Sequence, residues 1–181
     1  LNLGRHAVGA GDGIGERIFD AGTITADTVA LGTGGLDGRG TILQSGGTMT
    51  VANGVTDDGP SILGVFGGDF VVTTGGLSVD RFVAGRDHTD ATVTVNGGDV
   101  RIGTGTEDLD IGDRQGADTK GVVDFSNASS VTIDVNDLHL GRESGAAGLN
   151  EGDLTLSAAG TNTITASEIM VAYGCLLYTS D

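Results

Sequence analysis

The side chains that could do chemistry in this 181-residue chain are mostly acidic: Asp and Glu number 25, against 9 Lys and Arg, three His and one Cys. The densest acidic phrase is EDLDIGD at 107–113. An EF-hand calcium loop has a glycine at its sixth position and a glutamate at its twelfth. Counted from Asp108, these positions hold Asp113 and Thr119, so the phrase does not form such a loop. The repeated G-G-x-G-x-D of calcium-binding solenoids is missing too. We therefore expect no cofactor or dedicated metal site, with calcium attracted to carboxylate clusters only nonspecifically.

The histidines and the cysteine do not form a recognisable site. His139 is flanked by two leucines, and Asp110 by Leu and Ile; in a strand this alternation predicts that both polar side chains face solvent. His6 and His88 lie in polar stretches, and no two histidines are spaced to share a zinc ion on one helix. Cys175 is alone, so an intrachain disulfide is excluded.

Arginines recur at one phase, where Arg86, Arg114 and Arg142 each follow a short alternating segment. One interpretation is an anion-binding stripe, for example for an acidic polysaccharide. The other is a surface ladder in which neighbouring acids screen stacked guanidinium groups, each pair contributing roughly 0–1 kcal/mol. Because the net charge is −16, we favour the ladder.

A polysaccharide lyase or hydrolase would need acids that converge on one outer face. Asp87 and Asp90 flank His88, and Asp57 precedes Asp58, but neither group has identifiable partners in a neighbouring repeat. The chain also lacks a phosphate-binding G-x-x-x-x-G-K-[ST] and a nucleophile elbow. We therefore expect no enzyme activity. The polysaccharide lyase or hydrolase stays the alternative, and its only support is the analogy of fold.

The composition indicates an all-β protein. Glycine supplies 34 residues, proline one and tryptophan none, and strong helix formers are scarce. Collagen is excluded because there is no G-X-Y period. No apolar run approaches the length of about 20 residues that spans a bilayer. The acidic surface repels nucleic acid and anionic membranes, so we expect neither as a partner and no membrane insertion by this segment.

The elements that would position these residues form a repeat. Three short segments alternate apolar and polar residues, which is the period of a strand: 92–95, 99–103 and 108–112. The unit recurs, with Val93, Val123 and Leu154 at equivalent positions 30 and 31 residues apart. Laid over 91–102, the segment 61–72 extends this period backwards. The repeat predicts a right-handed single-stranded parallel β-helix, a solenoid of about five coils of three short strands, rather than an antiparallel sandwich or barrel.

The alternation also predicts which residues face the interior and which make the corners. Gly pairs at 46–47, 67–68 and 97–98 are expected between the first and second strands of a coil, and glycines 32, 85, 112, 141 and 174 are expected to end the third strand with positive φ. Asn127 is expected to hydrogen-bond along the stack. The inward set of the two clearest coils is Val93, Val95, Val100, Ile102, Leu109, Ile111, Val123, Phe125, Val131, Ile133, Leu138 and Leu140.

We expect one incomplete β-helix domain over residues 1–174. The chain opens with Leu and no signal segment follows, which is typical of a fragment of a longer reading frame. Residues 175–181, CLLYTSD, abandon the Gly-rich alternation. They resemble translated sequencing-adapter read-through, so we treat them as a non-native tail.

The repeat grammar resembles a known family. The phrases LHLGRESGAAG (138–148) and GDLTLS (152–157), followed by a TIT strand at 163–165, are similar to the passenger repeats of autotransporters and to strand repeats of large bacterial surface proteins. The resemblance covers nearly all of 1–174, without a C-terminal membrane barrel or an adhesive tip. It implies an extracellular or cell-surface bacterial protein in which this segment is a structural rod or stalk, adhesin-like, with flanking coils of the same chain as partners and host-surface or polysaccharide ligands. The alternative is a carbohydrate-binding or polysaccharide-degrading β-helix.

Overall fold

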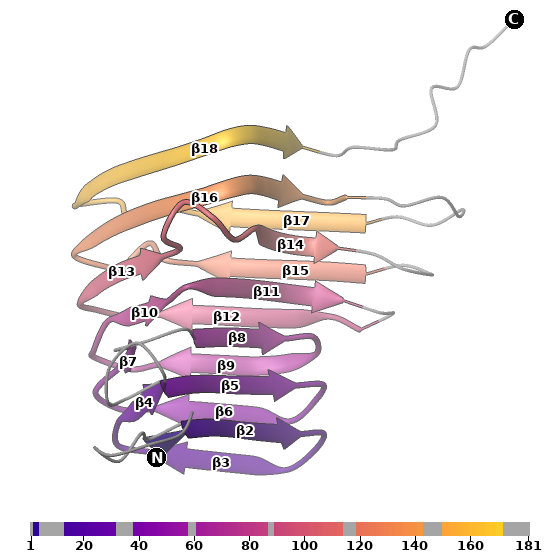
Figure 1. The fold of residues 1–181 in the computed structure, drawn as a ribbon, viewed down its shortest axis with the longest axis vertical. Helices are drawn as coiled ribbons and strands as arrows, with labels where there is room; N and C mark the ends of the chain where they lie inside the picture. Colours follow the sequence, from indigo (N-terminus) through magenta and orange to yellow (C-terminus); the bar gives the residue numbers. More distant parts are fainter. Residues whose placement is uncertain are drawn as a thin grey trace, which may run out of the picture.

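A computed structural model describes residues 2–3, 13–31, 38–57, 61–86, 89–113, 119–142 and 150–171. Strands are the only regular elements in these ranges, and every strand pair is parallel (Figure 1). This is the architecture that glycine-punctuated alternation favours, because each short segment has one apolar side to bury.

The strands form three faces. Face 1 consists of β2 (Gly13–Phe19), β5 (Gly38–Gln44), β8 (Ser61–Val65), β11 (Arg81–Arg86) and β14 (Leu109–Asp113). Face 2 consists of β3 (Thr23–Ala26), β6 (Thr48–Val51), β9 (Gly68–Val72), β12 (Ala91–Val95), β15 (Thr119–Asp124) and β17 (Asn150–Thr155). Face 3 consists of β1 (Asn2–Leu3), β4 (Val29–Leu31), β7 (Val55–Asp57), β10 (Leu77–Val79) and β13 (Asp99–Ile102). Two longer strands, β16 (Ser130–Leu140) and β18 (Thr161–Val171), run along face 3 and bend into face 1.

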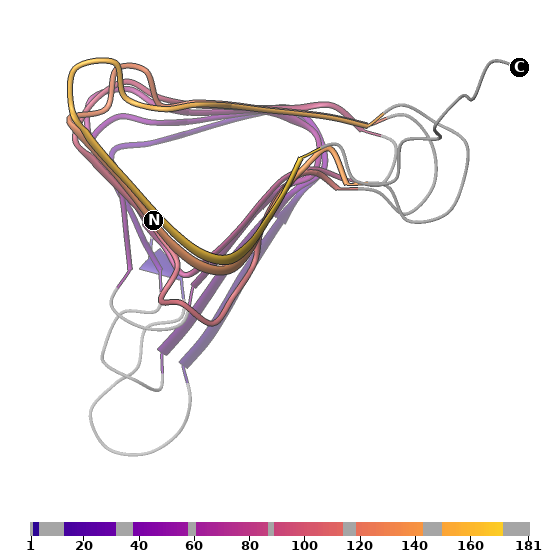
Figure 2. The ribbon, with the colours of Figure 1, turned by 90° about the horizontal axis from the view of Figure 1, so that it is seen from above.

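The predicted right-handed parallel β-helix is confirmed. Viewed from the C-terminal end, the chain runs counterclockwise around a triangle as it rises toward the viewer (Figure 2). Face 2 is a sheet of six strands, one more than the expected number of coils.

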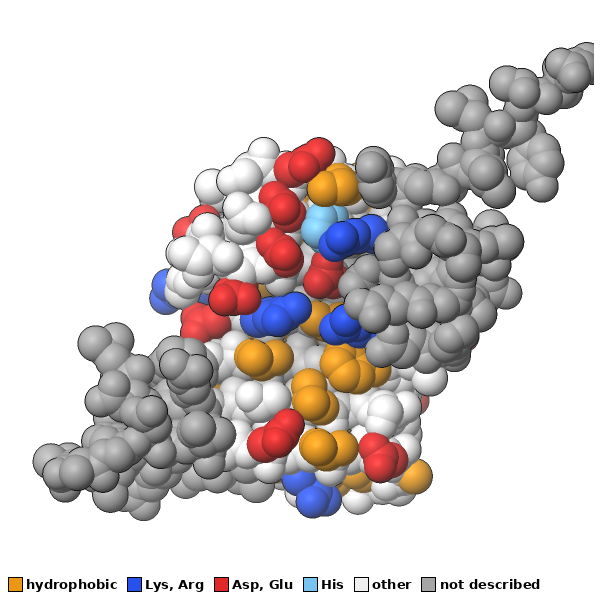
Figure 3. Space-filling model, turned by 45° about the vertical axis from the view of Figure 1, so that its right-hand side comes forward, with side chains coloured by type: hydrophobic (Ala, Val, Ile, Leu, Met, Phe, Trp, Pro, Cys, Tyr) orange, Lys and Arg blue, Asp and Glu red, His pale blue; other side chains and the backbone are white. Residues whose placement is uncertain are grey.

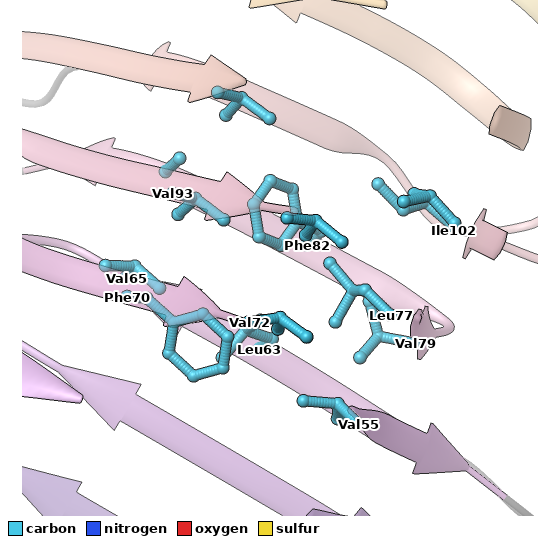
Figure 4. Packing of buried hydrophobic residues seen from close by; sticks show 14 of the residues in the cluster. Val55, Leu63, Val65, Phe70, Val72, Leu77, Val79, Phe82, Val93 and Ile102 are labelled. Carbon is cyan, nitrogen blue, oxygen red and sulfur yellow. The ribbon is translucent and has the colours of Figure 1, made fainter. Parts of the chain in front are cut away.

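The interior is a narrow stack of apolar columns. Eleven residues of the predicted inward set are at most 2% exposed, and Leu140 packs against the same cluster. Val93 lies in register with Val123, and Ile102 with Ile133, so like residues stack one turn apart. Figure 4 shows Leu63 and Val72 beside the ring of Phe70 inside one turn. The alternation therefore identified the core correctly.

The backward extension of the 30-residue period is wrong. Leu63 pairs with Phe82 on face 1, whereas Val93 pairs with Phe70 on face 2, only 23 residues earlier. A turn needs three strands and three corners, so its length depends on the connections between them. Early in the chain the longer connections, such as 32–37, fall between faces 3 and 1, whereas 114–118 and 143–149 fall between faces 1 and 2. The repeat therefore has no single length.

The glycine pairs occupy two different corners, not the single corner predicted. Gly46–Gly47 and Gly67–Gly68 stack between faces 1 and 2, and a Cβ on Gly68 would meet the backbone of Gly47. The pair Gly97–Gly98 lies between faces 2 and 3, against Gly75–Gly76. The expectation for the end of the third strand is confirmed where the structure describes it: φ is +74°, +68° and +68° at glycines 85, 112 and 141. Gly32 and Gly174 lie outside the described residues.

Candidate functional site

The prediction that Asp110 and His139 face solvent is wrong. Both occupy outward positions of face 1, in register with each other on β14 and β16, but they are only 5% and 2% exposed. Val83, the register partner of Asp110 on the turn before, is equally enclosed at 3%. Alternation gives the side of the strand on which a residue lies, whereas burial on the outer side depends on the neighbouring side chains.

The two side chains form a short hydrogen bond. Nδ1 of His139 lies 2.6 Å from Oδ1 of Asp110. A carboxylate can only accept, so Nδ1–H donates to Asp110. Nη1 of Arg142 lies 3.4 Å from the same Nδ1. Because that nitrogen carries its proton toward Asp110, the guanidinium acts as a neighbouring charge rather than as a donor to the ring. Nε2 of His139 is buried and has no hydrogen-bond partner among the residues that the structure describes.

The Asp110–His139 pair resembles the carboxylate–histidine part of a hydrolase site. A carboxylate that fixes the Nδ1–H tautomer leaves Nε2 to exchange a proton with a nucleophile or a leaving group. Here Nε2 of His139 is enclosed, and no side chain of the described ranges hydrogen-bonds to it. In the same ranges, no group of three or more His, Cys, Asp or Glu could hold a metal ion. The geometry is therefore that of a sealed polar pair.

The acidic phrase 107–113 is used for hydrogen bonding between turns. Oδ1 of Asp108 accepts from the backbone N of Asp137 at 3.2 Å and from Nδ2 of Asn136 at 3.3 Å. The carbonyl oxygen of Glu107 accepts from the backbone N of Asn136. These contacts tie one turn to the next, because the side chain of Asp108 replaces a strand partner where face 1 begins.

Face 1 changes character along the axis. Around β5 and β8 an apolar pair lies on the outer side: Leu43 and Phe66 meet in the space over Gly64, each within about 3.0 Å of where a Cβ on that glycine would lie. In Figure 3 the orange side chains gather in the lower half of this surface, whereas most of the red and blue side chains lie in the upper half. The alternation within 61–66 contains this signal, because Ile62, Gly64 and Phe66 alternate with the inward Leu63 and Val65.

The structure describes two of the three arginines of the predicted surface ladder, Arg86 and Arg142. Arg86 lies in register with Asp113 rather than with Arg114, and its guanidinium carbon lies 5.7 Å from the centroid of the Phe66 ring. Arg142 lies beside His139. Arg114 lies outside the described residues, so the ladder as a whole stays a prediction.

Most of the residues considered for a lyase or hydrolase site lie outside the part of the chain that the structure describes. Asp87, His88 and Asp58 lie outside the described residues. Oδ1 of Asp90 accepts from the backbone N of Lys120 at 3.0 Å, which is a structural contact between turns.

Sequence reasoning missed an ion cluster on face 2. Nζ of Lys120 lies 2.6 Å from Glu151 and 3.8 Å from Asp153. The hydrogen bond that Nζ of Lys120 donates to Oε2 of Glu151, followed by the negative charge of that carboxylate, raises the pKa of Lys120 above its ordinary value of 10.5. The 31-residue step that places Thr119 on Asn150 also places Lys120 on Glu151, so the period itself carried the signal.

The polar ladder expected at a corner is confirmed. Nδ2 of Asn127 donates to Oδ1 of Asn96 at 3.1 Å, one turn below. A second ladder links Asn53 to Asp27 at 2.6 Å and to Thr74 at 3.2 Å. These contacts fix corners rather than bind a ligand.

Searches of family models, curated proteins and solved structures gave no match to this chain. Among the described residues, no helix has the length and apolar character needed to cross a membrane. The molecule is therefore characterised by its fold, an all-parallel β-solenoid with stacked, repeating strands.

Proposed function

We propose that this chain is a structural rod or stalk segment of an extracellular or cell-surface bacterial protein, of the autotransporter-passenger or adhesin-like type. The observation that carries the proposal is the unbroken stacking of interior columns from turn to turn. One column on face 1 runs through six strands: Ile42, Leu63, Phe82, Leu109, Leu138 and Ile169.

The mechanism is mechanical. Each strand hydrogen-bonds to the strand above and below it, so the length of the molecule grows by about 4.8 Å per turn without requiring a wider core. Corner ladders such as Asn96–Asn127 add side-chain links between the same turns. A net charge of −16 supports solubility of such a rod.

Cell-surface display tests the location. The complete gene would be expressed in a bacterial host, and intact cells would be labelled with an antibody raised against residues 61–142. We expect labelling of intact cells and loss of the epitope on brief protease treatment, while a cytoplasmic marker stays protected. Labelling that appears only after lysis would contradict the proposed location.

The carbohydrate-active alternative has one specific observation in its favour: the Asp110–His139 pair, in which Nε2 of His139 has no hydrogen-bond partner within the described ranges. It is tested by incubating the chain with acidic polysaccharides and measuring new reducing ends. A rod produces none, whereas turnover that His139→Gln abolishes and Asp69→Asn preserves would move the chain to the enzyme class.

A further inference from the structure

One outward column of face 1 is apolar from β2 to β11. Its members are linked by register from strand to strand, and they are Ile18, Leu43, Gly64 and Val83. Ile62 and Phe66, two residues before and after Gly64, are partly exposed and widen the apolar surface around β8. All of these residues lie on the side of the solenoid, so additional turns at either end would leave them facing outward.

The charges that flank this column differ between its two ends. At the β2 end they are the exposed carboxylates of Glu16 and Asp20. Oδ1 of Asp20 accepts from Oγ of Ser45 on the next turn at 2.6 Å, which holds its carboxylate on the outer side. At the β11 end the flanking side chains are Arg81 and Arg86. Figure 3 shows this surface as a group of orange side chains with blue side chains along its upper border and red side chains at its lower end.

A surface arranged in this way is complementary to itself. A two-fold axis perpendicular to face 1, placed between β5 and β8, reverses both the order of the turns and the direction of the strands. It sets the β11 end of one copy over the β2 end of the other, so the apolar column meets itself in reverse order. Arg81 lies two residues before the column on β11, and Asp20 lies two residues after it on β2. The axis therefore brings each Arg81 to the Asp20 of the other copy.

We propose that face 1 is the contact surface of a two-fold symmetric dimer, in which two copies of this chain lie side by side and antiparallel. Charge complementarity specifies the occupant, because the surface carries acids and arginines at the positions that the same surface requires. A polyanion such as an acidic polysaccharide would use the arginines, but Glu16 and Asp20 would repel it. Nε of Arg81 is buried and has no hydrogen-bond partner among the described residues, so this side chain is available to a partner.

The size of the surface sets the expected strength of the contact. From β2 to β11 the column crosses three strand spacings, about 14 Å at about 4.8 Å each. A contact of this size is typical of weak, reversible association, so we expect a monomer–dimer equilibrium that depends on concentration. The inference goes beyond the proposed rod function and concerns only the side of the solenoid. The proposed location can therefore fail while dimerisation holds, and dimerisation can fail while the location holds.

Sedimentation equilibrium of the full chain over a concentration series measures the dimer dissociation constant. Arg81→Asp sets two carboxylates against each other and should raise this constant by about tenfold or more. Asp20→Arg sets two guanidinium groups together and should do the same. This second variant also lowers the net negative charge, so its effect is opposite to that of general repulsion. Mixed in equal amounts, the two variants should associate about as tightly as the parent chain, because both contacts then join opposite charges.

The matched control is Arg101→Asp, which makes the same change of net charge as Arg81→Asp at an exposed position of β13 on face 3. It should alter the dissociation constant by less than about twofold. Circular dichroism verifies that every variant keeps its β signal. A parent chain that stays monomeric, a control as disruptive as Arg81→Asp, or a mixture that does not associate would overturn the proposal. Association that both single variants leave unchanged would place the contact elsewhere on the molecule and would also overturn it.

Discussion

At the scale of single residues, the outer side of face 1 holds the least expected chemistry. Asp110 and His139 form a buried hydrogen bond in a column that also contains Val83 and Met170. A pair of this kind contributes little net stability when intact, but removing one member leaves a buried polar group without its partner.

Asp110→Ala should therefore lower the free energy of unfolding by about 1–3 kcal/mol, the usual cost of an unsatisfied buried group. Urea denaturation followed by circular dichroism measures it. Asp69→Ala, which removes an exposed carboxylate, is the matched control and should stay within about 0.5 kcal/mol. The double change Asp110→Val with His139→Met should regain most of the loss, because it continues the column with apolar side chains. A double variant as unstable as the single one would show that the pair itself is required.

Lys120 gives a pH dependence whose sign follows from its contacts. Glu151 raises the folded-state pKa of Lys120 above the unfolded value of 10.5. The stabilisation is then fully present below pH 10.5 and is lost as pH rises through the raised folded pKa. Between neutral pH and pH 10.5, the difference in unfolding free energy between the parent chain and Lys120→Met should stay constant. Above pH 10.5 this difference should become smaller. Lys120→Arg, which stays charged, should show no such decline. A difference that grows with alkaline pH would contradict the assignment.

Residue-level prediction succeeded for the interior and failed for the exterior for one reason. Period-2 alternation reports the side of the strand, and the interior of a solenoid is covered wherever turns lie on both sides, so residues such as Val93 and Ile133 were identified as buried. Coverage of the outer side depends on contacts between turns, such as the one between Asp110 and His139, which are 29 residues apart. No local pattern contains that information.

At the scale of elements, tight corners depend on glycine for two separate reasons, positive φ and close backbone approach. Gly68, at φ +84°, lies against the backbone of Gly47 on the turn below. Gly22 occupies the same corner of the first described turn with φ +95°, but a Cβ there would meet no atom of the described residues within 4 Å.

This contrast separates the two effects by mutation. Gly22→Ala should cost only the backbone strain, roughly 1–2 kcal/mol. Gly68→Ala should cost the same strain and, in addition, at least about 2 kcal/mol for displacing the adjoining turn. Thermal and urea unfolding of both variants measure the difference. Equal losses would show that close packing between turns at this corner is unimportant.

The number of residues per turn varies along the chain. The 30-residue step between Val93 and Val123 is real, but the step between Phe70 and Val93 is 23. Strand phrases of similar grammar occur on different faces, so laying 61–72 over 91–102 matched a face 1 strand with a face 2 strand. Only the pairing of the strands distinguishes the faces.

At the scale of the whole molecule, the length of a rod of stacked turns is set by the number of turns. Each turn contacts only the turns above and below it, so turns are expected to be interchangeable units with nearest-neighbour energetics. Thr119 lies in register with Asn150, so residues 119–149 constitute one complete turn. The residue that follows this turn occupies the position equivalent to its first residue, so copies of the turn can be joined end to end.

The most direct test inserts three additional copies of residues 119–149 after residue 149 and compares the maximum dimension of both chains by small-angle X-ray scattering. At about 4.8 Å per turn, the account predicts a folded chain about 14 Å longer, with an unchanged cross-section and the same circular dichroism signal per residue. A chain that keeps its original length and widens, or that gains only unfolded residues, would contradict the claim that this molecule is a rod built by stacking turns.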